Sequence, residues 1–162
     1  MSQLLAALVR ESAPMATWTA QARVAGLPDD VLTLLTEPHA IARWAPIPFE
    51  VLNFEGDRLV AGDRVRVQGP LVGRSLEFEV EVAEADDGRL VLTATGPITL
   101  DVEYLATPRP GGSEVRASVT VSGRGLMGRL LAQATDALLA SGALRTAVQR
   151  IACELEPALA AA

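Results

Sequence analysis

Residues 126–155 read LMGRLLAQATDALLASGALRTAVQRIACEL and contain no proline. At 1.5 Å of rise per residue, this segment predicts a helix of roughly 45 Å, longer than a small domain is wide. Gly142 lies midway and would allow the helix to bend. Apolar residues recur at steps that keep them on one side of a helix: Met127, Leu130, Leu131, Ala134, Leu138, Leu144, Val148, Ile151 and Leu155. A helix of this kind needs a surface to lie on.

The middle of the chain supplies that surface, because apolar and polar residues alternate there. The clearest case is residues 76–82, LEFEVEV, in which four apolar residues alternate with three glutamates. Turn residues such as those of the Asp-Asp-Gly sequence at 86–88 separate the segments. Further strand-like segments are residues 17–24, 49–55, 64–68, 89–95, 98–104 and 115–121. Short turns between consecutive strands predict an antiparallel sheet with one apolar face.

Two short helices are predicted between the first strand and the others. The sequence Pro-Asp-Asp at 28–30 is typical of a helix start, because proline fits the first turn and acidic residues interact favourably with the helix dipole. Pro38 ends that helix, and a second runs from about residue 39 to residue 44. We therefore expect an α+β fold, with a curved antiparallel sheet of about seven strands around a long C-terminal helix.

The length of 162 residues fits one domain. Met15 precedes the first strand, so we interpret residues 1–15 as an N-terminal extension and residues 16–160 as a single domain. Leu4, Leu5 and Leu8 allow at best a short amphipathic helix in the extension. Docking on the domain, an oligomer contact such as a homodimer, and mobility all remain open for it.

The composition excludes several classes of function. A net charge of −6 argues against nucleic acid or an anionic membrane surface as a partner, because phosphate binding needs clustered basic residues. All 14 basic residues are arginine, which excludes a lysine nucleophile or Schiff base; the Ala, Arg and Gly bias indicates a GC-rich, bacterial genome. No apolar run reaches the roughly 18 residues of a membrane span, and no signal peptide is recognisable. Cys153 is the single cysteine, which favours a reducing cytoplasm, and we expect it to be at least half buried.

Small residues on the inward faces of strands and helix predict unfilled volume between them. They include Ala20, Ala22, Ala94, Ala117 and Ala134, and the chain has only six aromatic residues with which to fill the interior. A ligand cavity between sheet and helix is one interpretation, and close backbone packing is the other.

Four short motifs then resemble the START-like SRPBCC superfamily, including its polyketide cyclase/dehydrase group. That family typically has a strand, a helical pair with a PxxVW…LTDP…W.P pattern, a glycine before the third strand and a long final helix. Leu32 replaces the common aromatic residue and Glu37 the common aspartate, and the resemblance spans residues 16–158. The matching motifs are PDDV at 28–31, LTEP at 35–38, WAP at 44–46 and GD at 62–63.

The resemblance implies the helix-grip fold, with a deep hydrophobic cavity that opens near the two short helices. It implies binding of a small hydrophobic molecule, a lipid or a polyketide-like compound, in that cavity. One alternative is a cofactor-free cyclase/dehydratase, and another is a protein-interaction module of the cochaperone or antitoxin-like type. The superfamily has no universal catalytic motif, so no catalytic residue is carried over.

Few residues are candidates for chemistry. His39 is the one histidine, near the expected cavity mouth, and could act as a general base or simply be solvated. Tyr104 could place its hydroxyl in the cavity or pack in the core. With one histidine and one cysteine we expect no metal site and no cofactor. We expect the following to contact ligand: Trp18, Trp44, Phe78, Leu92, Tyr104, Met127, Leu131, Ala134 and Leu138.

Strand parity decides whether two further residues belong to the site. Asp101 and Arg116 alternate with the apolar residues of their strands, so we expect them on the solvated face. A shift of one residue would turn both inward and make them catalytic candidates. Gly123, Gly125 and Gly128 superficially suggest a phosphate loop, but the spacing lacks its lysine, and we expect a flexible hinge into the last helix.

Overall fold

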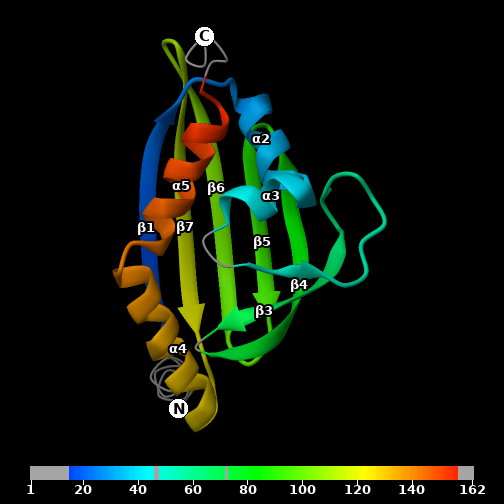
Figure 1. Cartoon of the computed structure of the whole chain (residues 1–162), viewed down its shortest axis with the longest axis vertical. Helices are drawn as coiled ribbons and strands as arrows, with labels where there is room; N and C mark the ends of the chain where they lie inside the picture. Colours follow the sequence, from blue (N-terminus) through cyan, green and yellow to red (C-terminus); the bar gives the residue numbers. More distant parts are fainter. Residues whose placement is uncertain (1–14, 46–47, 72, 157–162) are drawn as a thin grey trace, which may run out of the picture.

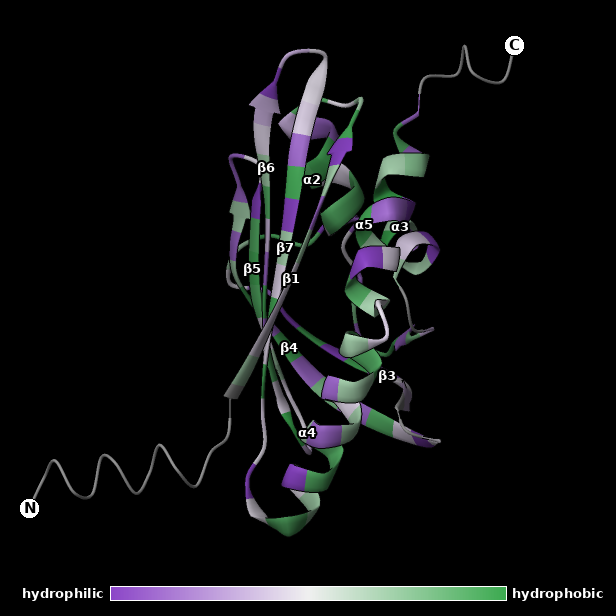
Figure 2. Cartoon of the chain, turned by 90° about the vertical axis from the view of Figure 1, so that its left-hand side faces the viewer, coloured by the Kyte–Doolittle hydropathy of each residue, from purple (hydrophilic) through white to green (hydrophobic). Residues whose placement is uncertain are grey.

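The computed structural model describes residues 15–45, 48–71 and 73–156. One antiparallel sheet has the strand order β1-β7-β6-β5-β4-β3-β2, and the helices lie on one side of it (Figures 1 and 2). The elements in chain order are β1 (Met15–Val24), α2 (Pro28–Thr36), α3 (Pro38–Trp44), β2 (Glu50–Val51), β3 (Arg64–Leu71), β4 (Arg74–Asp86), β5 (Arg89–Thr95), β6 (Thr99–Arg109), β7 (Gly112–Ser122), α4 (Gly125–Ala140) and α5 (Ala143–Glu154). The predicted fold class is confirmed. The expected short N-terminal helix lies outside the described residues.

The sheet has one charged face and one apolar face. The three glutamates at 77, 79 and 81 of β4 are exposed, and Arg64 of β3 lies 3.9 Å from Glu79 and 3.8 Å from Glu81. Asp101 and Arg116 are exposed on this same outer face. The inner face carries Val115, Ala117, Val119 and Val121 of β7, all buried. The alternation read from the sequence therefore has the expected parity.

Some strand limits differ from the prediction. The expected strand at residues 49–55 is reduced to Glu50–Val51, whereas β3 continues beyond the expected segment 64–68 to Leu71. β6 likewise extends to Arg109 and pairs with β7 up to Gly112. Backbone pairing with a neighbouring strand overrides the weak strand preference of glycine and proline at these hairpins.

The two short helices follow the local signals in the sequence. Asp30 accepts a hydrogen bond from the backbone N–H of Leu27 at 3.0 Å, which satisfies one donor at the start of α2. Pro38 starts α3 directly after α2, and the Trp44 indole at the end of α3 donates to the carbonyl oxygen of Leu34 at 2.7 Å. This hydrogen bond holds the second helix against the first.

The predicted C-terminal helix is divided into two helices. α4 ends at Ala140 and α5 begins at Ala143, with a change of direction between them (Figure 1). Gly142 has a φ of +102°, a left-handed conformation that glycine adopts without steric cost. Its backbone N–H donates to the carbonyl oxygen of Leu139 at 3.1 Å, which terminates α4. Gly142 thus stops one helix and starts the next, a larger effect than the expected bend.

The buried face of α4 is rotated relative to the predicted stripe. Its buried residues are Gly128, Leu131, Ala132 and Thr135, because Gly128 lies directly against the backbone of Gly123. This rotation leaves Leu126, Met127 and Leu130 exposed. The stripe prediction was wrong for Met127 and Leu130.

The position of Cys153 also differs from the expectation, because its side chain is exposed. The buried face of α5 is formed by Leu144, Ala147, Val148 and Ile151. Cys153 follows Ile151 by two residues, about 200° further around the helix, and therefore faces away from the sheet.

Candidate ligand-binding cavity

Two adjoining cavities lie between the inner face of the sheet and the helices. We call the first the helix chamber; its volume is about 260 Å³. It is lined by Leu35, Ile41, Trp44, Leu90, Leu92, Leu100, Val102, Tyr104, Val119, Thr135, Leu138, Leu139, Ala143 and Leu144. We call the second the loop chamber; its volume is about 170 Å³. It is lined by Pro38, Ile41, Phe49, Val51, Phe54, Leu59, Val65, Val67, Val80 and Leu92.

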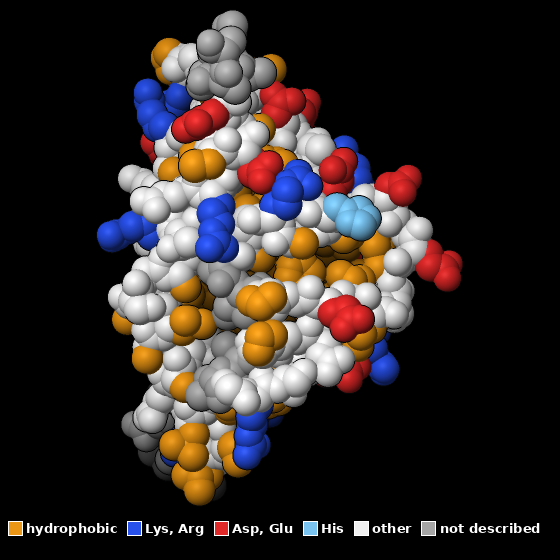
Figure 3. All heavy atoms as spheres, in the orientation of Figure 1, with side chains coloured by type: hydrophobic (Ala, Val, Ile, Leu, Met, Phe, Trp, Pro, Cys, Tyr) orange, Lys and Arg blue, Asp and Glu red, His pale blue; other side chains and the backbone are white. Residues whose placement is uncertain are grey.

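The chambers meet at Ile41 of α3 and Leu92 of β5, which line both. Ligand pockets commonly have volumes of roughly 300–1,000 Å³. Neither chamber alone reaches that range, but the two together do. Figure 3 shows hydrophobic side chains gathered in a hollow in the middle of the face that the helices cover. The joined chambers therefore have the size and lining of a site for a small apolar molecule.

Apart from the Trp44 indole N–H, the polar side-chain groups of the lining are the hydroxyls of Thr135 and Tyr104. The Thr135 hydroxyl donates to the carbonyl oxygen of Leu131 at 2.8 Å, within its own helix. The Tyr104 hydroxyl has no hydrogen-bond partner among the described residues. Every fully buried polar side-chain atom of those residues has a partner, so the Tyr104 oxygen keeps accessible surface. Because Tyr104 is only 5% exposed and lines the helix chamber, that surface faces the chamber.

Trp44 and Tyr104 form the polar-tipped aromatic pair of the helix chamber. Their ring centroids are 5.4 Å apart with an interplanar angle of 64°, an edge-to-face arrangement. The Trp44 N–H is already bonded to Leu34, so the pair presents one available hydrogen-bond donor, the Tyr104 hydroxyl. Burial raises the pKa of the Tyr104 phenol above its ordinary value of 10.0, and the group therefore stays protonated at neutral pH.

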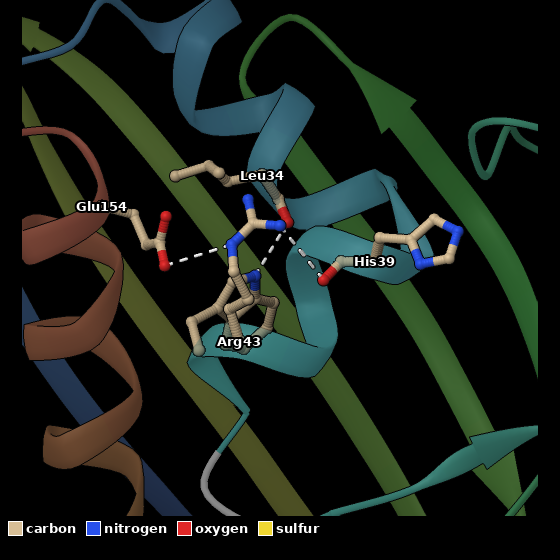
Figure 4. Close-up of polar contacts among 5 residues, drawn as sticks. Leu34, His39, Arg43 and Glu154 are labelled. Carbon is tan, nitrogen blue, oxygen red and sulfur yellow. Dashed lines mark hydrogen bonds and ion pairs between the residues drawn. The ribbon is translucent and has the colours of Figure 1, made fainter.

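Polar contacts tie α3, which covers both chambers, to α5. The Arg43 Nε atom lies 3.2 Å from a carboxylate oxygen of Glu154 (Figure 4). Arg150 donates from Nη1 to the carbonyl oxygen of Ala45 at 2.8 Å. Exposed contacts of this kind each contribute little stability. They connect α3 and the residue after it to α5 at the edge of the cavity.

Comparison with known proteins matches this arrangement. The sequence profile of the family described as polyketide cyclase / dehydrase and lipid transport matches residues 15–156. The chain belongs to that family. Its members form the helix-grip branch of the SRPBCC superfamily that the motifs indicated. A search of curated proteins gave no match.

Solved structures of this fold are similar over nearly the whole chain. A protein of Chromobacterium violaceum superposes with a TM-score of 0.66 at 17% identity, covering 88% of this chain and 99% of that one. The Zhui aromatase/cyclase of a Streptomyces species gives a TM-score of 0.65 at 15% identity, covering 90% and 96%. A Rhodobacter sphaeroides protein gives 0.57 at 22% identity, covering 93% and 99%. At these identities the likeness shows the fold alone.

The nine residues that the sequence predicted to contact ligand divide into two groups. Trp44, Leu92, Tyr104 and Leu138 line the helix chamber. The remaining five lie elsewhere. Trp18 lies at the junction of α4 and α5, and its indole N–H donates to Asp136 at 2.9 Å. Phe78 packs against the core and Leu131 is part of it, Met127 is exposed, and Ala134 is half buried on α4.

The polar candidates for catalysis lie away from the lining, apart from Tyr104. His39 lines neither chamber, and its exposed imidazole points away from Arg43 and Glu154 (Figure 4). Asp101 and Arg116 are on the opposite face of the sheet. Within the described ranges, no cluster of metal-ligating side chains is present. In the same part of the chain, no helix is long and apolar enough to cross a membrane.

The loop chamber was not predicted from the sequence. Phe49, Phe54 and Leu59 lie in the segment between α3 and β3, and all three line the loop chamber. Leu59 is held there because its backbone N–H donates to the Thr36 carbonyl oxygen at 2.9 Å. The available signal was two of the chain's three phenylalanines within one short, largely non-helical segment.

The pKa of Tyr104 predicts how the protein responds to alkali. In the unfolded chain the phenol ionises near 10.0, whereas burial holds it neutral in the folded protein. Below about pH 10 the phenol is neutral in both states, so its ionisation does not lower the free energy of unfolding. Above about pH 10 the phenol ionises in the unfolded chain, and the free energy of unfolding falls as the pH rises. Tyr104 is the single tyrosine, so near-ultraviolet phenolate absorbance reports on it alone. We expect that absorbance to appear together with the loss of circular dichroism; phenolate formation in the still-folded protein near pH 10 would contradict the burial.

Proposed function

We propose that the protein binds a small hydrophobic molecule, of lipid or polyketide-like type, in the joined helix and loop chambers. The observation that carries the proposal is the chemistry of the lining. Its side chains are apolar except for the Tyr104 and Thr135 hydroxyls and the Trp44 indole. An apolar ligand would gain roughly 25 cal/mol for each Å² of apolar surface removed from water.

The same lining favours binding over catalysis. A cyclase/dehydratase needs groups that move protons at the reacting atoms, and such groups usually work in pairs. Tyr104 is the one ionisable side chain of the two chambers, and burial raises its pKa away from neutrality. The protein-interaction alternative expects a collapsed cavity, whereas both chambers retain volume. Binding or transport is thus the better-supported role.

Native mass spectrometry of freshly purified protein tests the proposal directly. We expect a bound species of small mass, or, after delipidation, uptake of the uncharged fluorescent probe N-phenylnaphthylamine. Leu92→Trp fills the junction of the chambers and is expected to weaken probe uptake at least about tenfold. Leu52→Trp makes the same change at an exposed site outside both chambers and should leave uptake unchanged. Repeated absence of a bound species, together with equal uptake by both variants, would overturn the proposal.

A further inference from the structure

We infer that the ligand is an uncharged molecule with one hydrogen-bond acceptor, which the Tyr104 hydroxyl binds, and an apolar remainder that extends past Ile41 and Leu92 into the loop chamber. This inference rests on the proposed function and specifies its ligand class. It joins two observations, an unpartnered donor in one chamber and a purely apolar second chamber.

Tyr104 is only 5% exposed, and its hydroxyl, which faces the helix chamber, bonds to no described residue. A purely apolar ligand in the chamber would displace water from this hydroxyl and leave it without a partner, which costs free energy; a ligand acceptor would avoid that cost. On the neighbouring strand β7, Ala117 lies opposite Tyr104 in the register, so no bulky side chain occupies that position. A carbonyl, ester or ether oxygen is the group that fits an O–H donor.

No aspartate, glutamate, arginine or histidine lines either chamber. Three arginines that contact α2, α3 or its C-cap have protein partners: Arg43 bonds to Glu154, Arg58 to the Thr36 hydroxyl at 3.1 Å, and Arg150 to the Ala45 carbonyl. A carboxylate or phosphate in the cavity would therefore lose its hydration without gaining a countercharge, which is strongly unfavourable. The lining selects against ionised lipids such as free fatty acids.

The loop chamber is lined by aliphatic and aromatic side chains and by Pro38, with no polar side chain among them. Ile41 and Leu92 line both chambers, so a molecule that extends past these two side chains would occupy both. A ligand anchored at Tyr104 would place its hydrocarbon part there.

The experiment compares three probes of equal chain length: decane, methyl decanoate and decanoate. Each displaces N-phenylnaphthylamine from the full-length protein at about pH 8, where the acid is ionised. We expect decanoate to bind more than about tenfold more weakly than its methyl ester. We expect Tyr104→Phe to lower the affinity for the ester, relative to that for decane, about threefold to tenfold, because only the ester uses the hydroxyl.

The outcomes separate this inference from the proposed function. If neither the fluorescent probe nor decane binds, the proposed function fails. If both bind but decanoate matches the ester, or Tyr104→Phe leaves the affinity for the ester relative to decane unaffected, the inference alone fails. A measurement independent of the variant is the infrared carbonyl band of isotope-labelled methyl decanoate. It should shift to lower frequency in the complex, as a hydrogen-bonded ester does, and an unshifted band would contradict the inference.

Discussion

Replacing Trp44 by alanine is expected to lower the free energy of unfolding by about 3–5 kcal/mol and to abolish ligand binding. Trp44 is 5% exposed, packs edge-to-face on Tyr104 and donates to the Leu34 carbonyl oxygen. Its removal leaves a cavity next to the helix chamber and an unsatisfied acceptor at the end of α2. Chemical denaturation measures the first effect, and N-phenylnaphthylamine uptake measures the second.

Two further variants resolve the sources of this loss. Trp44→Phe keeps an aromatic ring but removes the N–H, so it should cost about 1–3 kcal/mol through the unsatisfied Leu34 carbonyl. Trp18→Ala is the matched control, because Trp18 is half buried and lies outside both chambers. We expect it to leave probe uptake intact and to destabilise less than Trp44→Ala. Equal destabilisation by the two alanine variants would show that Trp44 has no special structural role.

The strand parity was predictable because it depends on local alternation. Once Phe78 and Val80 are assigned to the inner face, the neighbouring glutamates must face outward, and antiparallel pairing propagates this parity to Asp101 and Arg116. The helix start at Pro28 was predictable for the same reason, since its signals are all within a few residues. Strand alternation also placed Tyr104 on the inner face, whereas Trp44 was expected there from its match to the family motif; both line the helix chamber.

The remaining features depend on contacts between distant segments. The buried face of α4 is set by the approach of Gly128 to Gly123 and Pro97, which hydrophobic spacing within the helix does not encode. Met127, apolar and correctly spaced for the stripe, is exposed as a result. Likewise, Phe49 and Phe54 line the loop chamber because β2, between them, pairs with β3 at the edge of the sheet, and no periodic pattern in the sequence marks this pairing. The sequence therefore predicted residues of the helix chamber, whereas Phe49 and Phe54 of the loop chamber were missed.

Gly123→Ala is expected to destabilise the protein by about 3 kcal/mol, at the upper end for an overpacked site. A Cβ atom at this buried position would overlap the carbonyl oxygen of Gly128 in the first turns of α4, a backbone atom that no rotamer change can move. Gly123 is therefore required for the close approach of two backbone segments, and the hinge expected from the glycine-rich sequence is a packed junction.

Binding should change together with stability, because α4 carries Leu138 and Leu139 of the helix chamber. Relieving the overlap moves the start of α4 away from β7, so we expect weaker probe uptake even at temperatures where the variant is folded. Gly125→Ala is the matched control: Gly125 has a φ of +70° and open space around its Cβ position, so this substitution adds backbone strain of about 1–2 kcal/mol without a clash. Equal stability and equal uptake for the two variants would mean that the contact between Gly123 and Gly128 does not position α4. A larger loss for Gly123→Ala would show that this contact, which directly follows the last residue of β7, positions α4 beside the helix chamber.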